Sequence, residues 1–365
     1  MKQRPVLPYV LNRCEVGGRI GRREKGGLTL KRMFLAALAL MGALLVAGCG
    51  DGEDAATPTA VPSPTQPLTS PIATPMTPAP TFTPMPSVGT PEASVPLGKI
   101  AFSSRRDGNG EIYLLTAESE TNMTNNPAED IECDLSPDGE KIVFASDREE
   151  TYDIWVVNVD GSGLTRLTED QAGDFSPRWS PDGKRIAFAR AGSLMVMDSD
   201  GSNVRAITKA KAEAVAPPCE AGAFLGSWSP DGERLTFYTA SATRGLGQVC
   251  IVDLDGSNLT VVVEDPPGYH VEPVWSPDGE WIAFRSIREG NHEIYIVHPD
   301  GTSETNLTNH PATDLEPDWS PDGQWIVFGT NRSGHFDLHI IKMDGSEVAR
   351  ITTSTGKDSD PSWQR

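Results

Sequence analysis

One motif recurs along most of the chain, and its spacing constrains the fold more than any other feature. The strings WSPDGKRIAF, WSPDGEWIAF and WSPDGQWIVF share a Trp, a Ser-Pro-Asp-Gly segment and an apolar run ending in Phe. The Trp position recurs at spacings of 44, 49, 47, 44 and 44 residues; it is occupied by Leu135, Trp179, Trp228, Trp275, Trp319 and Trp363. A period in the forties built from short strands is typical of the blades of a β-propeller.

Each repeat contains four short apolar runs, named A to D in chain order. Run A ends at the Trp position, run C reads EIYIV or DIWVV, and run D reads LTRLT, VRAIT or VARIT. Run B ends at Phe102, Phe144, Phe188, Phe237, Phe284 or Phe328. All are rich in β-branched or aromatic residues and are bounded by turn residues, and no helical periodicity competes. The sequence therefore predicts an all-β chain.

The links between runs A and B and between runs C and D carry turn chemistry. In Ser-Pro-Asp-Gly, Pro fits the second position of a type I turn, Asp the third, and Gly the positive φ that follows. Asp-Gly in VDGSG, SDGSN and LDGSN serves a tight C-to-D turn in the same way. We expect these acids to form turns.

The number of runs predicts how the ring closes. Run A occurs six times if residues 358–363 are included, and run B six times if residues 100–102 are included. The carboxyl terminus would then supply the inner strand of the blade that the amino-terminal strands begin. We expect a monomeric six-bladed β-propeller over residues 98–365, with the Trp side chains packed between neighbouring blades.

These repeats resemble the TolB-type propeller repeat, which also occurs in the non-catalytic domains of prolyl oligopeptidases and in oligogalacturonate lyases. The resemblance covers residues 98–365. In TolB a small α/β domain precedes the propeller, whereas here a leader and a Pro/Thr-rich segment precede it. The partner known for TolB, the peptidoglycan-associated lipoprotein, is therefore not carried over.

The leader predicts export. It ends in KRMFLAALALMGALLVAGCG, whose apolar run, residues 33–47, is shorter than the roughly 20 residues of a spanning helix. This favours a signal peptide over residues 1–48. The string VAGC at residues 46–49 resembles the bacterial lipobox, which implies lipidation of Cys49 and attachment to the outside of a bacterial membrane. An uncleaved anchor with an incidental Cys is the alternative, and it too leaves the folded part outside the cytoplasm.

Residues 49–97 are expected to be a disordered stalk. Residues 55–96 hold 12 Pro and 9 Thr and hardly any charge, a composition that favours an extended spacer. The rest of the chain is acidic: the net charge is −20, and residues 98–365 hold 22 Lys and Arg against 45 Asp and Glu. Such a charge excludes nucleic acid as a partner.

The variable links, between runs B and C and between runs D and A, share one end of the propeller, and function is more common on variable loops. The links KAKAEAVAPPCEAGAF and YTASATRGLGQ, both belonging to the repeat of Trp228, are enlarged. Run A also begins with acids at this end. An outer set, five residues before the Trp position, comprises Asp130, Asp174, His270, Asp314 and Asp358. An inner set, three residues before it, comprises Glu132, Glu272, Glu316 and Asp360.

Four arginines four residues beyond the run B Phe lie at the same end; they are Arg106, Arg148, Arg288 and Arg332. The outer acids are therefore expected either to form repeating Asp–Arg pairs between loops or to bind a ligand. The inner acids have no repeating partner in the sequence and, together with His270, are the better candidates for a site at the channel mouth. Since calcium takes several oxygen ligands, the inner set is also a candidate calcium site. No other cofactor is expected.

The remaining Cys and His residues carry less information. Cys219 and Cys250 are a candidate disulfide in an oxidising compartment, whereas Cys133 is expected to be buried and free. The histidines in B-to-C links or in run C share no offset and are given no role; they are His292, His298, His335 and His339.

The sequence favours a non-catalytic lipoprotein whose propeller binds a protein, peptide or cell-wall ligand on its variable face. One alternative is a metal-dependent hydrolase or lyase acting in the channel, for which His270 and Glu272 are the only nearby pair. Another is a structural assembly platform. A peptidase is disfavoured because the chain has no G-x-S-x-G elbow. The fold by itself does not decide between these functions.

Overall fold

The computed structural model describes residues 98–208, 222–241, 246–264 and 269–364. The predicted signal peptide, Cys49, the stalk and Cys219 lie outside these ranges. No helix within the described ranges is long and apolar enough to span a bilayer.

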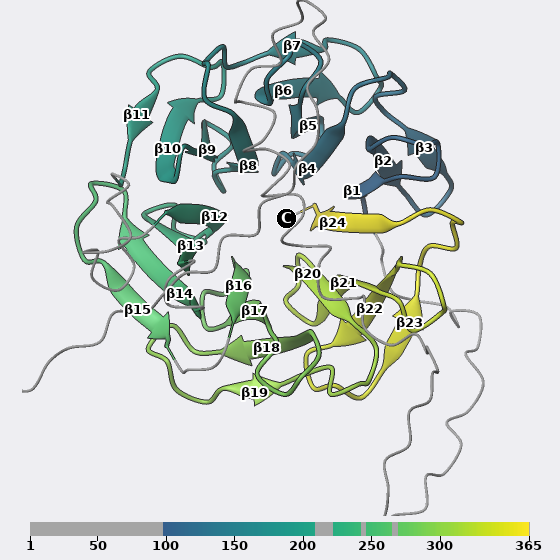
Figure 1. The fold of residues 1–365 in the computed structure, drawn as a ribbon, viewed down its shortest axis with the longest axis vertical. Helices are drawn as coiled ribbons and strands as arrows, with labels where there is room; N and C mark the ends of the chain where they lie inside the picture. Colours follow the sequence, from purple (N-terminus) through teal and green to yellow (C-terminus); the bar gives the residue numbers. More distant parts are fainter. Residues whose placement is uncertain (1–97, 209–221, 242–245, 265–268, 365) are drawn as a thin grey trace, which may run out of the picture. The chain divides into compact units, whose positions relative to one another are not determined.

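The described residues form six antiparallel four-stranded sheets arranged in a ring (Figure 1). Blade 1 holds β24 (Asp358–Trp363), β1 (Ile100–Ser104), β2 (Glu111–Leu115) and β3 (Glu120–Asn122). Blade 2 holds β4 (Asp130–Leu135), β5 (Lys141–Ser146), β6 (Asp153–Asn158) and β7 (Thr165–Arg166). Blade 3 holds β8 (Asp174–Trp179), β9 (Arg185–Arg190), β10 (Ser193–Asp198) and β11 (Arg205–Ala206).

The other three blades have the same order. Blade 4 holds β12 (Ala223–Trp228), β13 (Arg234–Ser241), β14 (Leu246–Asp253) and β15 (Thr260–Val263). Blade 5 holds β16 (His270–Trp275), β17 (Ile282–Ser286), β18 (Glu293–Val297) and β19 (Thr305–Asn306). Blade 6 holds β20 (Asp314–Trp319), β21 (Trp325–Thr330), β22 (Asp337–Lys342) and β23 (Val348–Arg350). Runs A to D are thus the four strands of a blade, counted from the centre outward, and the predicted six-bladed propeller is confirmed.

The ring closes as the repeat count predicts. Strand β24, from the carboxyl-terminal end of the chain, pairs antiparallel with β1, with Ile100 opposite Trp363 and Ser104 opposite Asp358. In Figure 1 the yellow β24 lies beside the blue β1 at the inside of the ring. Blade 1 therefore joins the two ends of the propeller, and β1 has a paired strand on each side.

The turns between A and B strands have the expected geometry. In blade 5, Gly279 has φ 76° and its N–H donates to the carbonyl oxygen of Ser276 at 3.0 Å. Asp278 Oδ1 accepts hydrogen bonds from Ser276 Oγ and from the N–H of Glu280. The Ser-Pro-Asp-Gly acid is therefore held within its own turn, as predicted.

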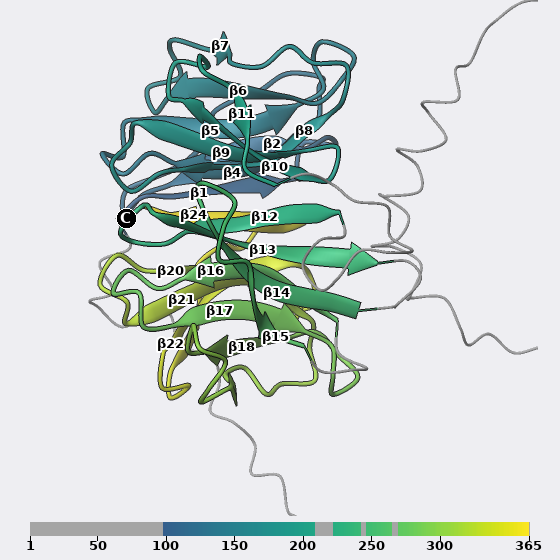
Figure 2. The same ribbon diagram turned by 90° about the vertical axis from the view of Figure 1, so that its left-hand side faces the viewer.

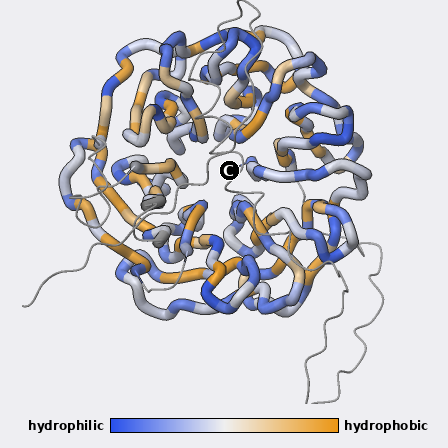
Figure 3. The backbone as a smooth tube through the Cα atoms, in the orientation of Figure 1, coloured by the Kyte–Doolittle hydropathy of each residue, from blue (hydrophilic) through white to orange (hydrophobic). Residues whose placement is uncertain are grey.

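The core consists of six apolar clusters, each shared by two adjacent blades. In one of them Trp319 and Phe328 of blade 6 pack against Val274, Ala283 and Ile294 of blade 5. Figure 3 shows the apolar segments along the strands and hydrophilic segments in the outer turns. The prediction that the Trp side chains pack between blades is confirmed, which explains why the motif recurs in each blade.

Blade 4 departs from the common pattern. Strands β13 and β14 have eight residues each, whereas the B and C strands of the other blades have five or six. Figure 2 shows these two strands extending beyond their neighbours on the right, which is the end of the B-to-C links. The variable end is therefore elongated at blade 4.

Candidate functional site

The A strands carry a bulge where the inner acids stand. The register between A and B strands shifts in every blade, as between Val271 and Val274 in blade 5. The residue three before the Trp position takes a positive φ in five of the blades: Glu132 54°, Ser176 51°, Glu272 57°, Glu316 54° and Asp360 50°. A positive φ is uncommon for residues other than glycine. The bulge changes the direction of these side chains relative to a regular strand.

Three inner acids make the same hydrogen bond to the next blade. Glu132 Oε2 accepts from the N–H of Ser176 at 2.6 Å, and Glu272 Oε2 accepts from the N–H of Glu316 at 3.1 Å. Glu316 Oε2 accepts from the N–H of Asp360 at 2.8 Å. The prediction that the inner acids have no repeating partner is therefore wrong for these three. Their partner is a backbone N–H, which every residue except proline carries, so the residue pattern does not reveal it.

The charges of the inner acids are unevenly compensated. Glu272 pairs with Arg285 at 2.8 Å, and Glu316 lies 3.8 Å from Lys357. Among the described residues, Glu132 and Asp360 have no ion pair. We call Glu132, Glu272, Glu316 and Asp360 the inner ring. Two of its four carboxylates therefore remain without a cationic neighbour at salt-bridge distance.

Burial shifts the acidity of the inner ring. Burial raises the pKa of Asp360 to about 8, and the negative charge of Glu316 adds to the rise. Burial also raises the pKa of Glu132 and that of Glu272, although the Arg285 charge opposes the shift at Glu272. The Glu316 charge raises the pKa of Lys357. Glu132, Glu272 and Asp360 therefore hold negative charge less readily than exposed carboxylates do.

The outer set lies in a different environment. Asp130, Asp174, Asp314 and Asp358 are each 0% exposed. The structure brings four of them to arginines at 2.6–2.9 Å: Arg148 to Asp130, Arg190 to Asp174, Arg332 to Asp314 and Arg106 to Asp358. The guanidiniums also lie over the run B phenylalanines, as Arg332 does over Phe328 at 5.1 Å. These acids therefore fasten loops to strands and are not accessible to a ligand.

In blade 5 a histidine replaces the outer Asp. His270 is 0% exposed, and its Nδ1 lies 3.4 Å from Arg288 Nη2. The Arg288 guanidinium also pairs with Glu304. His270 packs edge-on against Phe284. It thus takes the structural place of the outer Asp and is separated from the accessible acids by its burial.

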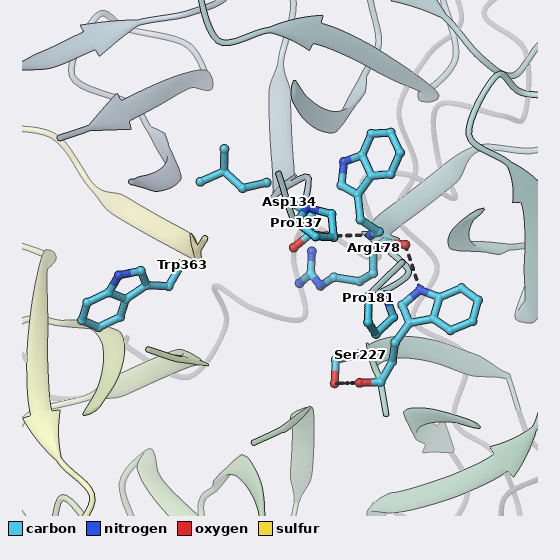
Figure 4. A pocket seen from close by; sticks show the side chains of 9 residues that line it. Asp134, Pro137, Arg178, Pro181, Ser227 and Trp363 are labelled. Carbon is cyan, nitrogen blue, oxygen red and sulfur yellow. Dashed lines mark hydrogen bonds between the residues drawn. The ribbon is translucent and has the colours of Figure 1, made fainter. Parts of the chain in front are cut away.

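A second layer of polar residues lies nearer the tight-turn end. Arg178 donates to the carbonyl oxygens of Cys133 in blade 2 at 3.3 Å and of Gly226 in blade 4 at 3.2 Å. It lines a small hollow with Asp134, Ser227 and Trp363 (Figure 4). Asp134 accepts a hydrogen bond from the N–H of Trp179, and Asp318 accepts one from the N–H of Trp363. Sequence reasoning missed this layer, although the position before the Trp varies between Asp, Arg, Ser and Val.

Two further residues near the inner ring were missed. The position after the run B Phe holds Ser103, Ala145, Ala189, Tyr238, Arg285 and Gly329. The residue at this position is small in four blades and large in the adjacent blades 4 and 5. Tyr238 stacks on Phe224 with ring centroids 5.1 Å apart, and Arg285 pairs with Glu272. A comparison of the six repeats at this position would have identified both.

Two aromatic pairs include phenols whose acidity is affected by acids of the inner ring. Besides the Phe224–Tyr238 pair, Tyr152 packs against Phe175 with centroids 5.0 Å apart, and all four rings are partly exposed. Burial raises the pKa of Tyr152 and that of Tyr238, and the charge of Glu132 contributes to both. The Glu132 carboxylate therefore lies within electrostatic reach of both phenols.

No group of three or more His, Cys, Asp or Glu in the described ranges could hold a metal ion. Cys133 is buried and free, and Cys250 takes part in a disulfide. Its predicted partner Cys219 lies outside the described residues, so that pairing stays a prediction. His298 stacks on Trp281, and His292 and His339 are largely buried with pKa values lowered by burial to about 4.

Comparison with known proteins places these features in a family. The sequence profile described as PD40, TolB beta propeller domain, matches residues 85–193 and 189–365. A stretch of 49 residues is 41% identical to the "Tol-Pal system protein TolB" of Syntrophus aciditrophicus (strain SB). This match covers 13% of the present chain and only 11% of that protein.

Two solved structures share the fold. The crystal structure of TolB from Acinetobacter baumannii is similar with a TM-score of 0.62 at 19% identity, over 73% of this chain and 66% of that one. A putative TolB from Agrobacterium tumefaciens is similar with a TM-score of 0.56 at 21% identity, over 71% of this chain and 90% of that one. Because the family profile matches well over half of the residues and the fold agrees, the chain belongs to the TolB β-propeller (PD40) family.

Proposed function

We propose that this chain is a non-catalytic, extracytoplasmic lipoprotein that binds a protein or peptide on the variable face of its propeller. The observation that carries the proposal is the arrangement of the departures from the repeat. The long β13–β14 hairpin, Tyr238 and Arg285 all lie in blades 4 and 5, toward the end where the inner ring stands. A constant scaffold with variation gathered at one end is the usual arrangement of a binding protein.

The relatives support a protein partner. One of them is named as a protein of the Tol-Pal system, and the family is defined by its propeller. No described feature favours the alternative of a metal-dependent enzyme in the channel, and none favours a purely structural platform over binding. Membrane attachment rests on the lipobox-like string that ends at Cys49. It predicts that Cys49→Ser moves the protein from the membrane fraction to the soluble fraction.

Photo-cross-linking in the producing cells tests the binding face. A benzoylphenylalanine replaces Ser333, an exposed residue of the β21–β22 link on the variable face, and in a matched chain it replaces the exposed Glu280 of the β16–β17 turn. We expect a discrete protein adduct from position 333 and none from position 280. Adducts from position 280 alone, or from neither position, would contradict the proposal.

A further inference from the structure

A groove lies at the tight-turn end of the propeller, between the neighbouring blades 3 and 4 (Figure 1). Its volume is about 660 Å³, and its lining consists of Arg185, Arg205, Glu233, Arg234, Asp253, Leu254 and Asp255. We call it the blade 3–4 groove. Sites for small molecules usually have volumes of roughly 300–1,000 Å³. The groove is therefore large enough for a small ligand, and its lining favours a charged one.

The two blades contribute different charges to the groove. Blade 3 supplies two cations, Arg185 at the start of β9 and Arg205 at the start of β11. Blade 4 supplies one cation and three acids; these are Arg234, Glu233, Asp253 and Asp255. Positive and negative groups are thus equal in number. The blade 3 side of the groove is cationic, and the blade 4 side is mainly acidic.

The two blade 3 arginines bind backbone carbonyls instead of carboxylates. Arg185 Nη2 donates to the carbonyl oxygen of Gly232 at 3.1 Å, and its guanidinium lies 5.0 Å from the ring centre of Trp228. Arg205 Nη1 donates to the carbonyl oxygen of Leu254 at 2.9 Å. Neither guanidinium has an ion pair among the described residues, whereas the arginines beside the outer acids each hold a buried Asp. Both therefore remain available to a carboxylate.

The acids of the groove are also free of arginine partners. The Glu233 carboxylate has no hydrogen bond or ion pair to another described residue. Asp253 Oδ2 accepts from Asn258 Nδ2 at 2.7 Å, and Asp255 Oδ1 accepts from the N–H of Ser257 at 2.8 Å, so both are bonded within their own turn. Opposite charges thus line one groove without forming ion pairs with one another.

The cationic side is a departure from the repeat. Arg205 pairs with the C strand of its blade at a position that Thr165 occupies in β7 and Thr305 in β19. The turn chemistry of the repeat does not require an arginine here, and Thr serves in the other two blades. Arg205 therefore adds a second cation beside Arg185 that the construction of a blade does not explain.

We propose that the blade 3–4 groove binds a short peptide with free ends, its carboxylate on Arg185 and Arg205 and its ammonium group on Glu233. A zwitterion complements a groove that has one cationic and one mainly acidic side. An anion alone fits less well, because the three acids would repel it. The groove lies at the end opposite the variable face, so this inference does not depend on the proposed function.

Three forms of trialanine test the need for both charges. They are the peptide with free ends, its N-acetyl form and its carboxyl-terminal amide. Binding to the full-length chain in a mild detergent is followed by saturation-transfer NMR titration, which suits weak ligands. We expect each blocked form to bind at least roughly tenfold more weakly than the free peptide. Equal binding of the three forms, or no binding of the free peptide, overturns the inference. Loss of binding by the amide alone would indicate an anion site and overturns it too.

Charge-removing variants test the location. Arg205→Gln keeps an N–H donor for the carbonyl oxygen of Leu254 and should weaken free trialanine roughly tenfold without affecting the amide. Glu233→Gln should weaken free trialanine without affecting the N-acetyl form. The controls are Lys184→Gln, next to Arg185 but 80% exposed and outside the groove, and Glu140→Gln, at the position of Glu233 in blade 2. Thermal scans verify that each variant is folded. If the controls weaken binding as much, the attraction is a general surface effect and the inference is wrong.

Discussion

Glu316 Oε2 in blade 6 accepts a hydrogen bond from the backbone N–H of Asp360 in blade 1 at 2.8 Å. The same bond joins Glu132 to Ser176 and Glu272 to Glu316. It links the bulge of one inner strand to the bulge of the next. Glu132, Glu272 and Glu316 therefore connect adjacent blades of the propeller, in addition to being candidates for ligand binding.

Replacing Glu316 tests the structural role. Glu316→Ala leaves the N–H of Asp360 without its acceptor and should lower the free energy of unfolding by about 1–3 kcal/mol. For a domain of this size, that corresponds to a fall in Tm of roughly 2–12 °C. Glu316→Gln keeps an acceptor oxygen, and its free energy of unfolding should therefore fall by less. Equal losses in calorimetric scans of the two variants would show that the hydrogen bond does not stabilise the ring.

The Asp–Arg pairs of the outer set should stabilise the fold more than the hydrogen bond of Glu316 does. Asp314 is 0% exposed and accepts from Arg332 Nη2 at 2.7 Å, so Asp314→Ala leaves a guanidinium that is 13% exposed without its partner. Breaking such a pair costs about 3–5 kcal/mol. Lys342 and Glu347 form an exposed pair that serves as the control, and Glu347→Ala should change stability by less than about 1 kcal/mol. A double-mutant cycle with Arg332→Ala measures the coupling, and a coupling near zero would contradict this account.

The repeat made most of the fold predictable from the sequence. Trp275, Phe284 and Gly279 recur because each blade needs a packed Trp, a packed Phe and a positive φ after its turn. The closure by β24 followed from counting runs, because a lone A strand at the carboxyl end can pair only with the blade that lacks one. Where the geometry of a blade requires a residue type, comparing the six repeats of this one chain reveals that requirement.

The site was less predictable because its contacts do not depend on residue type. The partner of Glu272 is the N–H of Glu316, and the partner of Arg178 is the carbonyl oxygen of Gly226. Arg190 was missed because the β9–β10 link is a short turn, so the arginine moves onto the strand itself and leaves the offset of Arg148 and Arg332. The tertiary fold determines which backbone groups these side chains meet and how a shorter link shifts an arginine. The residue pattern alone therefore predicts neither.

Removing residues 358–365 should destabilise the whole ring. The deletion removes β24, exposes the edge of β1 and takes Trp363, which is 1% exposed, out of the core cluster of blades 1 and 6. We expect a large fall in Tm and aggregation on heating. The milder Trp363→Ala, which keeps the strand, should cost about 3–5 kcal/mol. A deletion variant that melts at the wild-type temperature would exclude closure by β24.

Cys133 should be chemically silent in the folded protein. The side chain is 1% exposed, and burial raises the pKa of its thiol well above 9, whereas the thiolate is the reactive form. Iodoacetamide at pH 8 should therefore leave Cys133 unmodified in the native chain and alkylate it fully in guanidinium chloride. Peptide mapping by mass spectrometry gives the extent at each step, and rapid labelling of the native chain would show that β4 opens readily.

The inner ring should make stability depend on pH through Asp360. Its pKa is about 8 in the folded chain, owing to burial first and to the Glu316 charge second, against an ordinary value near 4 when unfolded. Between about pH 4 and pH 8 the folded chain holds a proton that the unfolded chain releases, so this group's contribution to stability falls as the pH rises through that window. Asp360→Asn has no proton to lose, and its Tm relative to wild type should therefore increase from pH 5 to pH 8.5.

Asp231, a turn residue whose pKa is lowered, serves as the control for the pH dependence. A hydrogen bond from Ser229 lowers the pKa of Asp231, so that this carboxyl stays ionised from pH 5 to pH 8.5 in both states, and the stability change of Asp231→Asn should be constant over that range. Thermal scans of wild type and both variants at several pH values measure these differences. If Asp360→Asn shows the same flat difference as Asp231→Asn, Asp360 is already ionised at pH 5. The desolvation of its carboxylate would then be offset by contacts that stabilise the ionised form.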